Sequence, residues 1–190
     1  VDYRKDKHLL VYCGAATMRE PGYKEGVIED FEMRQIDVVS DLLGNKLGMG
    51  ISQFTSTESA SERERLKKEF AEGDKIQALV AIRCLDEGVN IPNIKTAFLL
   101  ASSTNPKEYI QRRGRVLRKF PGKHYATIYD FITLPRKLDN VQFISEDEWK
   151  MDLSLIKREI TRIRDFADLA QNPAQSDFLI SAIEEAYGLS

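Results

Sequence analysis

A glutamine and two arginines are the residues of this chain whose spacing points most clearly to chemistry. If residues 106–119 form a helix, Gln111, Arg115 and Arg118 fall within about 60° of one another on one face. The sequence predicts this helix, because Asn105 is a favourable N-cap residue before it. Two guanidinium groups one turn apart suit the spread charge of a phosphoryl group in transfer. We therefore expect them to act as arginine fingers; the alternative is a solvated basic helix face.

Two glycines and two polar residues near this face extend the candidate site. We expect Gly114 to remove a side chain that would crowd the arginines. A loop that follows a predicted buried strand carries Glu87, Gly88 and Asn90, and such loops are where parallel sheets bind ligands. Gly88 allows close approach of backbone to a ligand, and the other two supply acceptors. By itself this loop is also typical of an ordinary turn.

The charges of the chain are distributed unevenly, although its formal net charge is only −2. Residues 102–137 contain nine Lys and Arg residues and two acidic residues, whereas residues 138–190 contain five and eleven. A basic segment between acidic ones predicts a phosphate-bearing partner: a nucleotide, a nucleic acid or both.

Composition excludes several classes of protein. No apolar run approaches the ~20 residues that span a membrane. Two cysteines and two histidines form no metal-binding pattern, so we expect no metal site and a reduced, cytoplasmic protein. The chain begins at Val1, and we expect it to be part of a longer polypeptide.

Short apolar runs rich in β-branched and aromatic residues alternate with helical patterns. The predicted strands are Leu9 to Cys13, Ile51 to Thr55, Ala78 to Ile82, Thr96 to Ala101 and Ala126 to Ile132. The predicted helices span residues 29–47, residues 61–72 with a capping box of Ser61 and Glu64, and residues 106–119. Residues 16–27 are predicted to be a long loop. This alternation predicts an α/β domain with a parallel sheet and helices on both faces.

The sequence changes in character after residue 137, so we expect a domain over residues 1–137 and a helical extension over residues 138–190. A capping box of Ser145 and Glu148 opens the extension. An apolar stripe follows at heptad spacing: Trp149, Leu153, Ile156, Ile160, Ile163, Ala167 and Ala170. Asn172 and Pro173 are expected to end this helix and cap a second one, with an apolar face of Phe178, Ile183 and Tyr187. The stripe either packs against its own domain or docks another domain or chain.

Four segments, taken in order, resemble motifs of superfamily 2 helicases and translocases. Residues 111–118, Gln-Arg-Arg-Gly-Arg-Val-Leu-Arg, resemble motif VI in the form found in excision-repair helicases, restriction-enzyme motor subunits and flavivirus-type helicases. Residues 78–92 resemble motif V and residues 9–14 resemble motif IV. The stretch from Phe54 through Arg63 to Asp74 resembles the segment between motifs IV and V. The resemblance covers roughly residues 8–135.

The resemblance implies the second RecA-like motor domain of an ATPase, which closes on a first domain with ATP and Mg²⁺ between them. It implies that Arg115 and Arg118 reach the γ-phosphate, with Gln111 beside it. It also implies that Gly88 and Asn90 line the nucleotide cleft. Nucleic-acid backbone is expected at loops after the strands: Gly14, Ala15, Thr55, Ser56, Ile82 and Arg83. DNA is expected over RNA as the partner.

Some residues depart from the family pattern. Ile82 stands where many members have a threonine that touches nucleic acid, and Asn90 stands where aspartate is common. Val116-Leu117 replaces the frequent Thr-Gly, which moves the match away from DEAD-box RNA helicases. The chain contains no Gly-x-x-x-x-Gly-Lys-Ser/Thr loop and no Asp-Glu-x-His or Asp-Glu-x-Asp run. We therefore expect it to hydrolyse no ATP on its own.

Two other functions remain open at this stage. One is a motor of the same architecture that acts on a polypeptide, as the bacterial preprotein translocase ATPase does. The other is a RecA-like module that only binds nucleic acid or a partner. The paired arginines argue against the second alternative, because a pure binding module has no need of them.

Overall fold

The computed structural model describes residues 6–14, 17–18, 33–82, 91, 93–100, 110 and 113–189. The chain divides into two compact units, Val1–Phe131 and Ile132–Ser190. This division falls before the predicted boundary at residue 137, because Ile132 and Leu134 pack in the core of the second unit.

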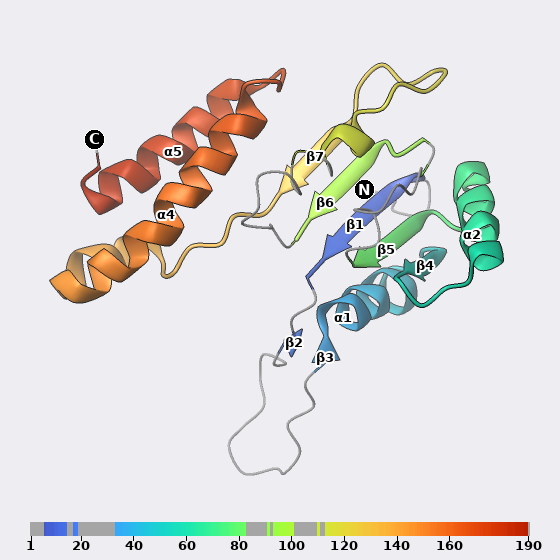
Figure 1. The fold of residues 1–190 in the computed structure, drawn as a ribbon, viewed down its shortest axis with the longest axis horizontal. Coiled ribbons are helices and arrows are strands. Elements are labelled where there is room, and N and C mark those ends of the chain that lie inside the picture. Colours follow the sequence, from blue (N-terminus) through green and yellow to red (C-terminus); the bar gives the residue numbers. More distant parts are fainter. Residues whose placement is uncertain are drawn as a thin grey trace, which may run out of the picture. The chain divides into compact units, whose positions relative to one another are not determined.

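A five-stranded parallel sheet forms the centre of the first unit, with the strand order β4-β5-β1-β6-β7 (Figure 1). The strands are β1 (Leu9–Cys13), β4 (Ile51–Phe54), β5 (Ala78–Ile82), β6 (Thr96–Leu99) and β7 (Thr127–Asp130). The predicted parallel sheet is confirmed, and β1 and β5 have the predicted bounds. The other three strands are shorter than predicted. A separate antiparallel pair joins β2 (Thr17–Met18) to β3 (Met33–Arg34).

Helices lie on both faces of this sheet. The connection from β1 to the edge strand β4 contains α1 (Gln35–Asp41), and the return from β4 to β5 contains α2 (Ala60–Glu72). Since these connections run in opposite directions across the sheet, right-handed crossovers place α1 and α2 on opposite faces. In agreement, alternate residues of β1 (Leu9, Val11 and Cys13) pack with Ile36 of α1. The residues between them point to the other face.

The ends of these helices differ from the prediction. The helix expected over residues 29–47 begins at Gln35 and continues from Leu42 to Lys46 as a π-helical turn. The capping box of α2 is formed by Ser59 and Glu62, so the predicted pair of Ser61 and Glu64 is wrong. The Ser-x-x-Glu pattern occurs twice in this segment, and spacing alone does not show which serine adopts the extended backbone of an N-cap.

His8 joins three segments at the amino end of the sheet. Its ring nitrogen Nε2 lies 3.1 Å from the carbonyl oxygen of Ala71 at the end of α2. The amide of Asn93 lies 3.3 Å from Nδ1, and the ring packs edge-on against Phe70. A neutral imidazole with its proton on Nε2 satisfies both hydrogen bonds. Burial lowers the pKa of His8 below 6.5, and the neighbouring Lys95 and Lys7 lower it further.

The second unit consists of two helices, α4 (Glu146–Ala167) and α5 (Pro173–Tyr187), preceded by a 3₁₀ helix (Leu138–Phe143). The predicted capping box of Ser145 and Glu148 is confirmed. The apolar stripe of α4 packs on α5 and the 3₁₀ helix, in a core built of Val141, Ile156, Ile160, Ile163, Ile180, Ile183 and Tyr187. The stripe is therefore covered within its own unit.

A buried polar cluster joins α4 and α5 to the segment before them. Arg136 binds both carboxylate oxygens of Asp152, at 2.7 and 3.2 Å. The hydroxyl of Tyr187 donates to the same carboxylate at 3.0 Å. The Arg136 guanidinium holds the pKa of Asp152 below its usual value, whereas burial raises the pKa of Tyr187 to about 12. These bonds hold one register of α5 against α4.

Three expectations for the second unit are wrong. Ala170 lies after the end of α4 and is exposed. Phe178 is 81% exposed, because the face of α5 that meets α4 is centred on Ile180, Ile183 and Tyr187. Asn172 occupies the N-cap position of α5 without capping it, since its side chain bonds to the side chain of Gln175.

We expect the stability of the chain to depend on pH through His8. The unfolded chain takes up a proton on this residue as pH falls below about 6.5, whereas the folded chain resists it. Stability is therefore fully present above that pH and decreases below it, by at most about 1.4 kcal/mol per pH unit. Urea unfolding of wild type and His8→Asn between pH 5 and 7.5 measures this. The difference in free energy of unfolding between wild type and His8→Asn should narrow toward pH 5. If that difference stays constant over this range, the lowered pKa of folded His8 is contradicted.

We expect Ile183 and Phe178 to differ sharply in their effect on stability. Ile183 is fully buried, so Ile183→Ala should lower the free energy of unfolding of the second unit by about 2–5 kcal/mol. Phe178→Ala should change it by less than about 0.5 kcal/mol, because the ring is exposed. Equal losses in denaturant unfolding of the two variants would show that the face of α5 is assigned wrongly.

Candidate functional site

The helix that carries Arg115 ends earlier than predicted. Residues 110 and 113–116 are helical, and residue 117 is already in a turn. The amide of Leu117 donates to the carbonyl of Arg113 at 3.0 Å, whereas the amide of Arg118 reaches only Arg115, at 3.4 Å. Arg118 therefore lies just beyond the helix, and the prediction that it shares a helical face with Arg115 is wrong. The Pro121-Gly122 pair lies five residues after Val116, the last helical residue, and prevents the helix from resuming there.

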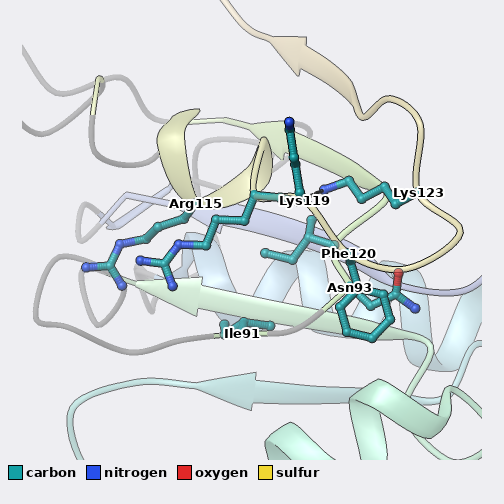
Figure 2. Close-up of a pocket in the computed structure, with 8 residues that line it drawn as sticks. Ile91, Asn93, Arg115, Lys119, Phe120 and Lys123 are labelled. Atoms are coloured by element: carbon teal, nitrogen blue, oxygen red, sulfur yellow. Dashed lines mark hydrogen bonds between the residues drawn. The ribbon is translucent and has the colours of Figure 1, made fainter.

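Arg115 and Arg118 nevertheless line one pocket (Figure 2). The pocket has a volume of about 190 Å³ and is lined by three segments: Ile91, Asn93 and Ile94; Arg115, Arg118, Lys119 and Phe120; and Lys123. Two arginines and two lysines thus surround it, and none of its described lining residues is acidic. Figure 2 shows Arg115, Lys119 and Lys123 extending in three different directions. Such a lining favours an anion over a cation or an apolar ligand.

Lys123 is held against the end of the Arg115 helix. Its ammonium group donates to the carbonyl oxygens of Val116 and, at 3.2 Å, of Arg118. The side chain is half-buried, and this burial lowers the pKa of Lys123 below its usual 10.5. The pocket therefore contains one lysine that is bonded to backbone.

Asn93 connects the pocket to the sheet. It lines the pocket and also bonds to the His8 ring at 3.3 Å. Both residues have positive φ angles, 58° for Asn93 and 63° for His8. Asparagine and histidine tolerate this backbone conformation better than most residues, although it is uncommon. The pocket wall is thus tied to the central strand.

The predicted nucleic-acid residues that the structure describes lie at the carboxyl ends of three neighbouring strands. Gly14 follows β1, Thr55 and Ser56 follow β4, and Ile82 ends β5. The register pairs Cys13 with Ile82 and Phe54 with Ala81, so these positions meet at one edge of the sheet.

Two of these residues already have partners within the chain. The Gly14 amide donates to the side chain of Gln35 at 2.6 Å. The Thr55 amide and hydroxyl both donate to Glu58, at 2.7 and 2.8 Å. Ser56 is exposed, and among these positions it is therefore the side chain best placed for an outside contact.

Three lining residues of the pocket lie near the amino ends of strands. Asn93 and Ile94 come just before β6, and Lys123 comes just before β7. The amino ends of β1, β6 and β7 are aligned by hydrogen bonds from Lys95 to His8 and from Thr127 to Lys95. The sequence did not predict this position of the three residues.

Six predicted site residues lie outside the described residues: Gln111, Glu87, Gly88, Asn90, Ala15 and Arg83. Their roles stay predictions. Sequence reasoning missed Asn93, Lys119, Phe120 and Lys123, which also line the pocket. The local excess of basic residues and the Pro-Gly pair were the signals that could have found Lys119 and Lys123.

Gly114 has open space around it apart from its own helix. With its two chain neighbours and the helix backbone left out, a Cβ atom built on it meets no described atom within 4 Å, and the residue is exposed. The expected relief of crowding beside Arg115 stays a prediction, because Arg115 is one of these two neighbours.

Within the described parts of the chain, no group of three or more His, Cys, Asp and Glu residues is arranged to hold a metal ion. None of the helices in those parts combines the length and the apolar character that crossing a membrane requires.

The helicase conserved C-terminal domain family matches residues 22–120, just over half of the chain. The chain therefore belongs to this family. With the parallel sheet, the helices on both faces and the C-terminal helices, it has the RecA-like fold that the sequence predicted.

Two relatives with similar sequences have names that fit this family. The chain is 33% identical over 82 residues to candidate helicase 22 of Sulfolobus islandicus filamentous virus. It is 34% identical over 58 residues to the DNA 3'-5' translocase XPB2 of Sulfurisphaera tokodaii. These matches cover 43% and 30% of this chain, and 15% and 13% of the two relatives. The chain thus corresponds to a small part of each relative.

Solved structures support the fold at low sequence identity. The C-terminal part of the Fun30 ATPase domain matches 94% of this chain over 48% of its own length, with a TM-score of 0.52 and 15% identity. The yeast DEAD-box splicing factor Prp28 matches 97% of this chain over 32% of its own length, with a TM-score of 0.54 and 16% identity.

We expect Gly114→Ala to stabilise the chain. Glycine in a helix costs roughly 0.5–1 kcal/mol relative to alanine, and the added methyl group meets open space. Denaturant unfolding of the variant should show a gain of that size. A loss of stability would mean that this position is crowded within the folded chain.

Proposed function

We propose that this chain is the second motor domain of an ATP-dependent nucleic-acid helicase or translocase. In this proposal a first RecA-like domain of the same protein holds ATP with Mg²⁺, and this chain supplies Arg115 and Arg118 to its phosphates. Loops at the carboxyl ends of the strands contact the nucleic-acid backbone. The membership of the helicase C-terminal domain family and the paired motif VI arginines support this proposal.

The observation that carries the proposal is the pocket lined by Arg115, Arg118, Lys119 and Lys123. Guanidinium groups offer donors in a fixed fork that fits phosphate oxygens, and they stay charged at any physiological pH. Arg118 is exposed beyond the helix end, so it can meet a phosphate on a separate domain. ATP supplies the phosphoryl group, and the arginines stabilise the negative charge on its oxygens during transfer.

Gly114 gives independent support for a close partner at this position. A helical glycine whose added Cβ atom would meet no described atom beyond its own helix, beside two arginines, suits the approach of a group from outside the described chain. We therefore expect Gly114→Ala to lower ATP hydrolysis even though it stabilises the fold.

The carboxyl edge of the sheet suits nucleic-acid backbone. It places Ser56 and the ends of β1 and β5 in one row, and phosphate contacts of this kind carry no sequence information. That property fits a motor that steps along its substrate. DNA is the proposed substrate, in line with the name of the archaeal translocase. Because Thr55 and Gly14 have internal partners, their contribution is to shape the loops.

A RecA-like module that binds nucleic acid or a partner without catalysis is the alternative. It predicts no effect of the arginines on ATP turnover. The following experiment separates the two functions.

We expect Arg118→Ala to abolish nucleic-acid-stimulated ATP hydrolysis by the protein that joins this chain to its first RecA-like domain. An arginine finger is worth roughly 10³–10⁵ in rate, so a loss of at least about 10³-fold is expected while ATP still binds. Turnover is measured with single-stranded and double-stranded DNA and RNA, and the best stimulator identifies the substrate. The matched control is Arg65→Ala, because Arg65 is exposed and its ion pair in the described part of the chain is with Glu69 on α2.

Wild-type turnover in Arg118→Ala would overturn the motor proposal in favour of the binding module. Loss of turnover in Arg65→Ala as well would point to a general effect of removing arginine from the surface.

A further inference from the structure

We propose that Lys123 is a positioning residue for Arg115 and Arg118. Its ammonium group binds backbone at the end of the Arg115 helix and just beyond it. It thereby sets where the two guanidinium groups lie. This inference rests on the proposed function and adds to it a residue that acts through the arginines.

The contacts of Lys123 are with backbone carbonyls between and beside the arginines. Val116 follows Arg115 directly, and its carbonyl accepts one hydrogen bond from the ammonium group. The carbonyl of Arg118 accepts another at 3.2 Å. The last carbonyls of a helix have no partner within it, and a cation there also opposes the negative end of the helix dipole. Lys123 thus fastens both ends of the short segment from Val116 to Arg118.

A tight turn brings Lys123 back to the end of the Arg115 helix. Residues 120–123 form a tight turn, in which the Lys123 amide donates to the Phe120 carbonyl at 2.9 Å. Pro121 is second in this turn, and Gly122 is third with a φ angle of 77°. This arrangement matches a type II turn, which favours proline and requires a residue that tolerates positive φ. The turn at the Pro-Gly pair therefore directs Lys123 back toward the end of the helix.

The segment that Lys123 holds is largely exposed. Val116 is 1% exposed and anchors the helix in the core, but Leu117, Arg118 and Lys119 are all exposed. The Arg118 amide makes a long hydrogen bond of 3.4 Å. Three exposed residues separate the buried Val116 from the turn that begins at Phe120. Without the ammonium group, the carbonyls of Val116 and Arg118 would lose the hydrogen bonds that it donates. A shift of about 1 Å in a catalytic group can cost about 10²-fold in rate.

A positioning role predicts a specific kinetic signature. The arginines stabilise charge that develops during transfer, whereas the proposed first domain holds ATP in the ground state. Loss of Lys123 should therefore lower kcat with little change in KM for ATP. A lysine that instead bound ATP phosphate directly would raise KM.

The test uses Lys123→Met in the two-domain protein, because methionine keeps much of the apolar stem and removes the donors. We expect kcat for nucleic-acid-stimulated ATP hydrolysis to fall about 10–100-fold with KM for ATP within about 2-fold of wild type. Lys123→Arg, which keeps a cation with several donors, should recover most of the rate. Lys68→Met, at an exposed position on α2, is the control and should behave as wild type.

A double mutant separates positioning from independent binding. If Lys123 acts through the arginines, Lys123→Met should have little further effect in an Arg118→Ala background. The proposal would be overturned if the rate losses of Lys123→Met and Arg118→Ala multiply in the double mutant. A raised KM for ATP in Lys123→Met would also overturn it. Wild-type kcat in Lys123→Met would also overturn it, whatever its melting temperature. Should Lys123→Met fail to fold, Lys123→Gln, which keeps one donor group, takes its place under the same criteria.

The two proposals fail in distinguishable ways. If Arg118→Ala loses turnover but the Lys123 variants do not, the motor function stands and the role of Lys123 falls. If Arg118→Ala retains turnover, both fall together.

Discussion

The structure of the first unit depends on the pairing of β1 with strands on both sides. All five residues of β1 are buried, and β5 and β6 run parallel to it in continuous register. A strand in this position has no free backbone groups and no exposed face, so it is the part of the unit that can move least. Its direction defines a carboxyl edge and an amino edge for every other strand.

The carboxyl edge and the pocket have different linings. The carboxyl edge presents Ser56 and the ends of β1 and β5, whereas Asn93 and Lys123 line the pocket near the amino ends of β6 and β7. The His8 and Asn93 side chains join the pocket wall to the start of β1, and His8 also meets the end of α2, the helix that follows the Thr55 loop. In the proposed motor, these packed strands and side-chain hydrogen bonds offer a physical route between the pocket and the carboxyl edge.

The early end of the Arg115 helix shows how local chemistry shapes the site. A longer helix would have kept Arg118 on the same face as Arg115, as spacing alone suggests. Instead the helix ends at Val116, and a Pro-Gly turn brings a lysine back to the exposed carbonyls. The two arginines therefore reach the same pocket from different backbone environments, one helical and one extended from a turn. The sequence grouped Arg115 with Arg118 because their spacing would place them on one face of an ideal helix. The two residues do line one pocket, although Arg118 lies outside the helix.

The sequence by itself determined the parallel α/β fold, the bounds of β1 and β5, the capping box of α4 and the family, because these follow from local patterns of apolar, capping and motif residues. It also grouped Arg115 with Arg118, and these two residues do line one pocket. It could not choose between two overlapping capping boxes, or show that Phe178 lies outside the face of α5 that packs, since these outcomes depend on competition among nearby partners. Only the tertiary structure brought Asn93, Lys119, Phe120 and Lys123 together with the arginines. Their proximity arises from the order of the strands and the path of a turn, which spacing along the chain does not specify.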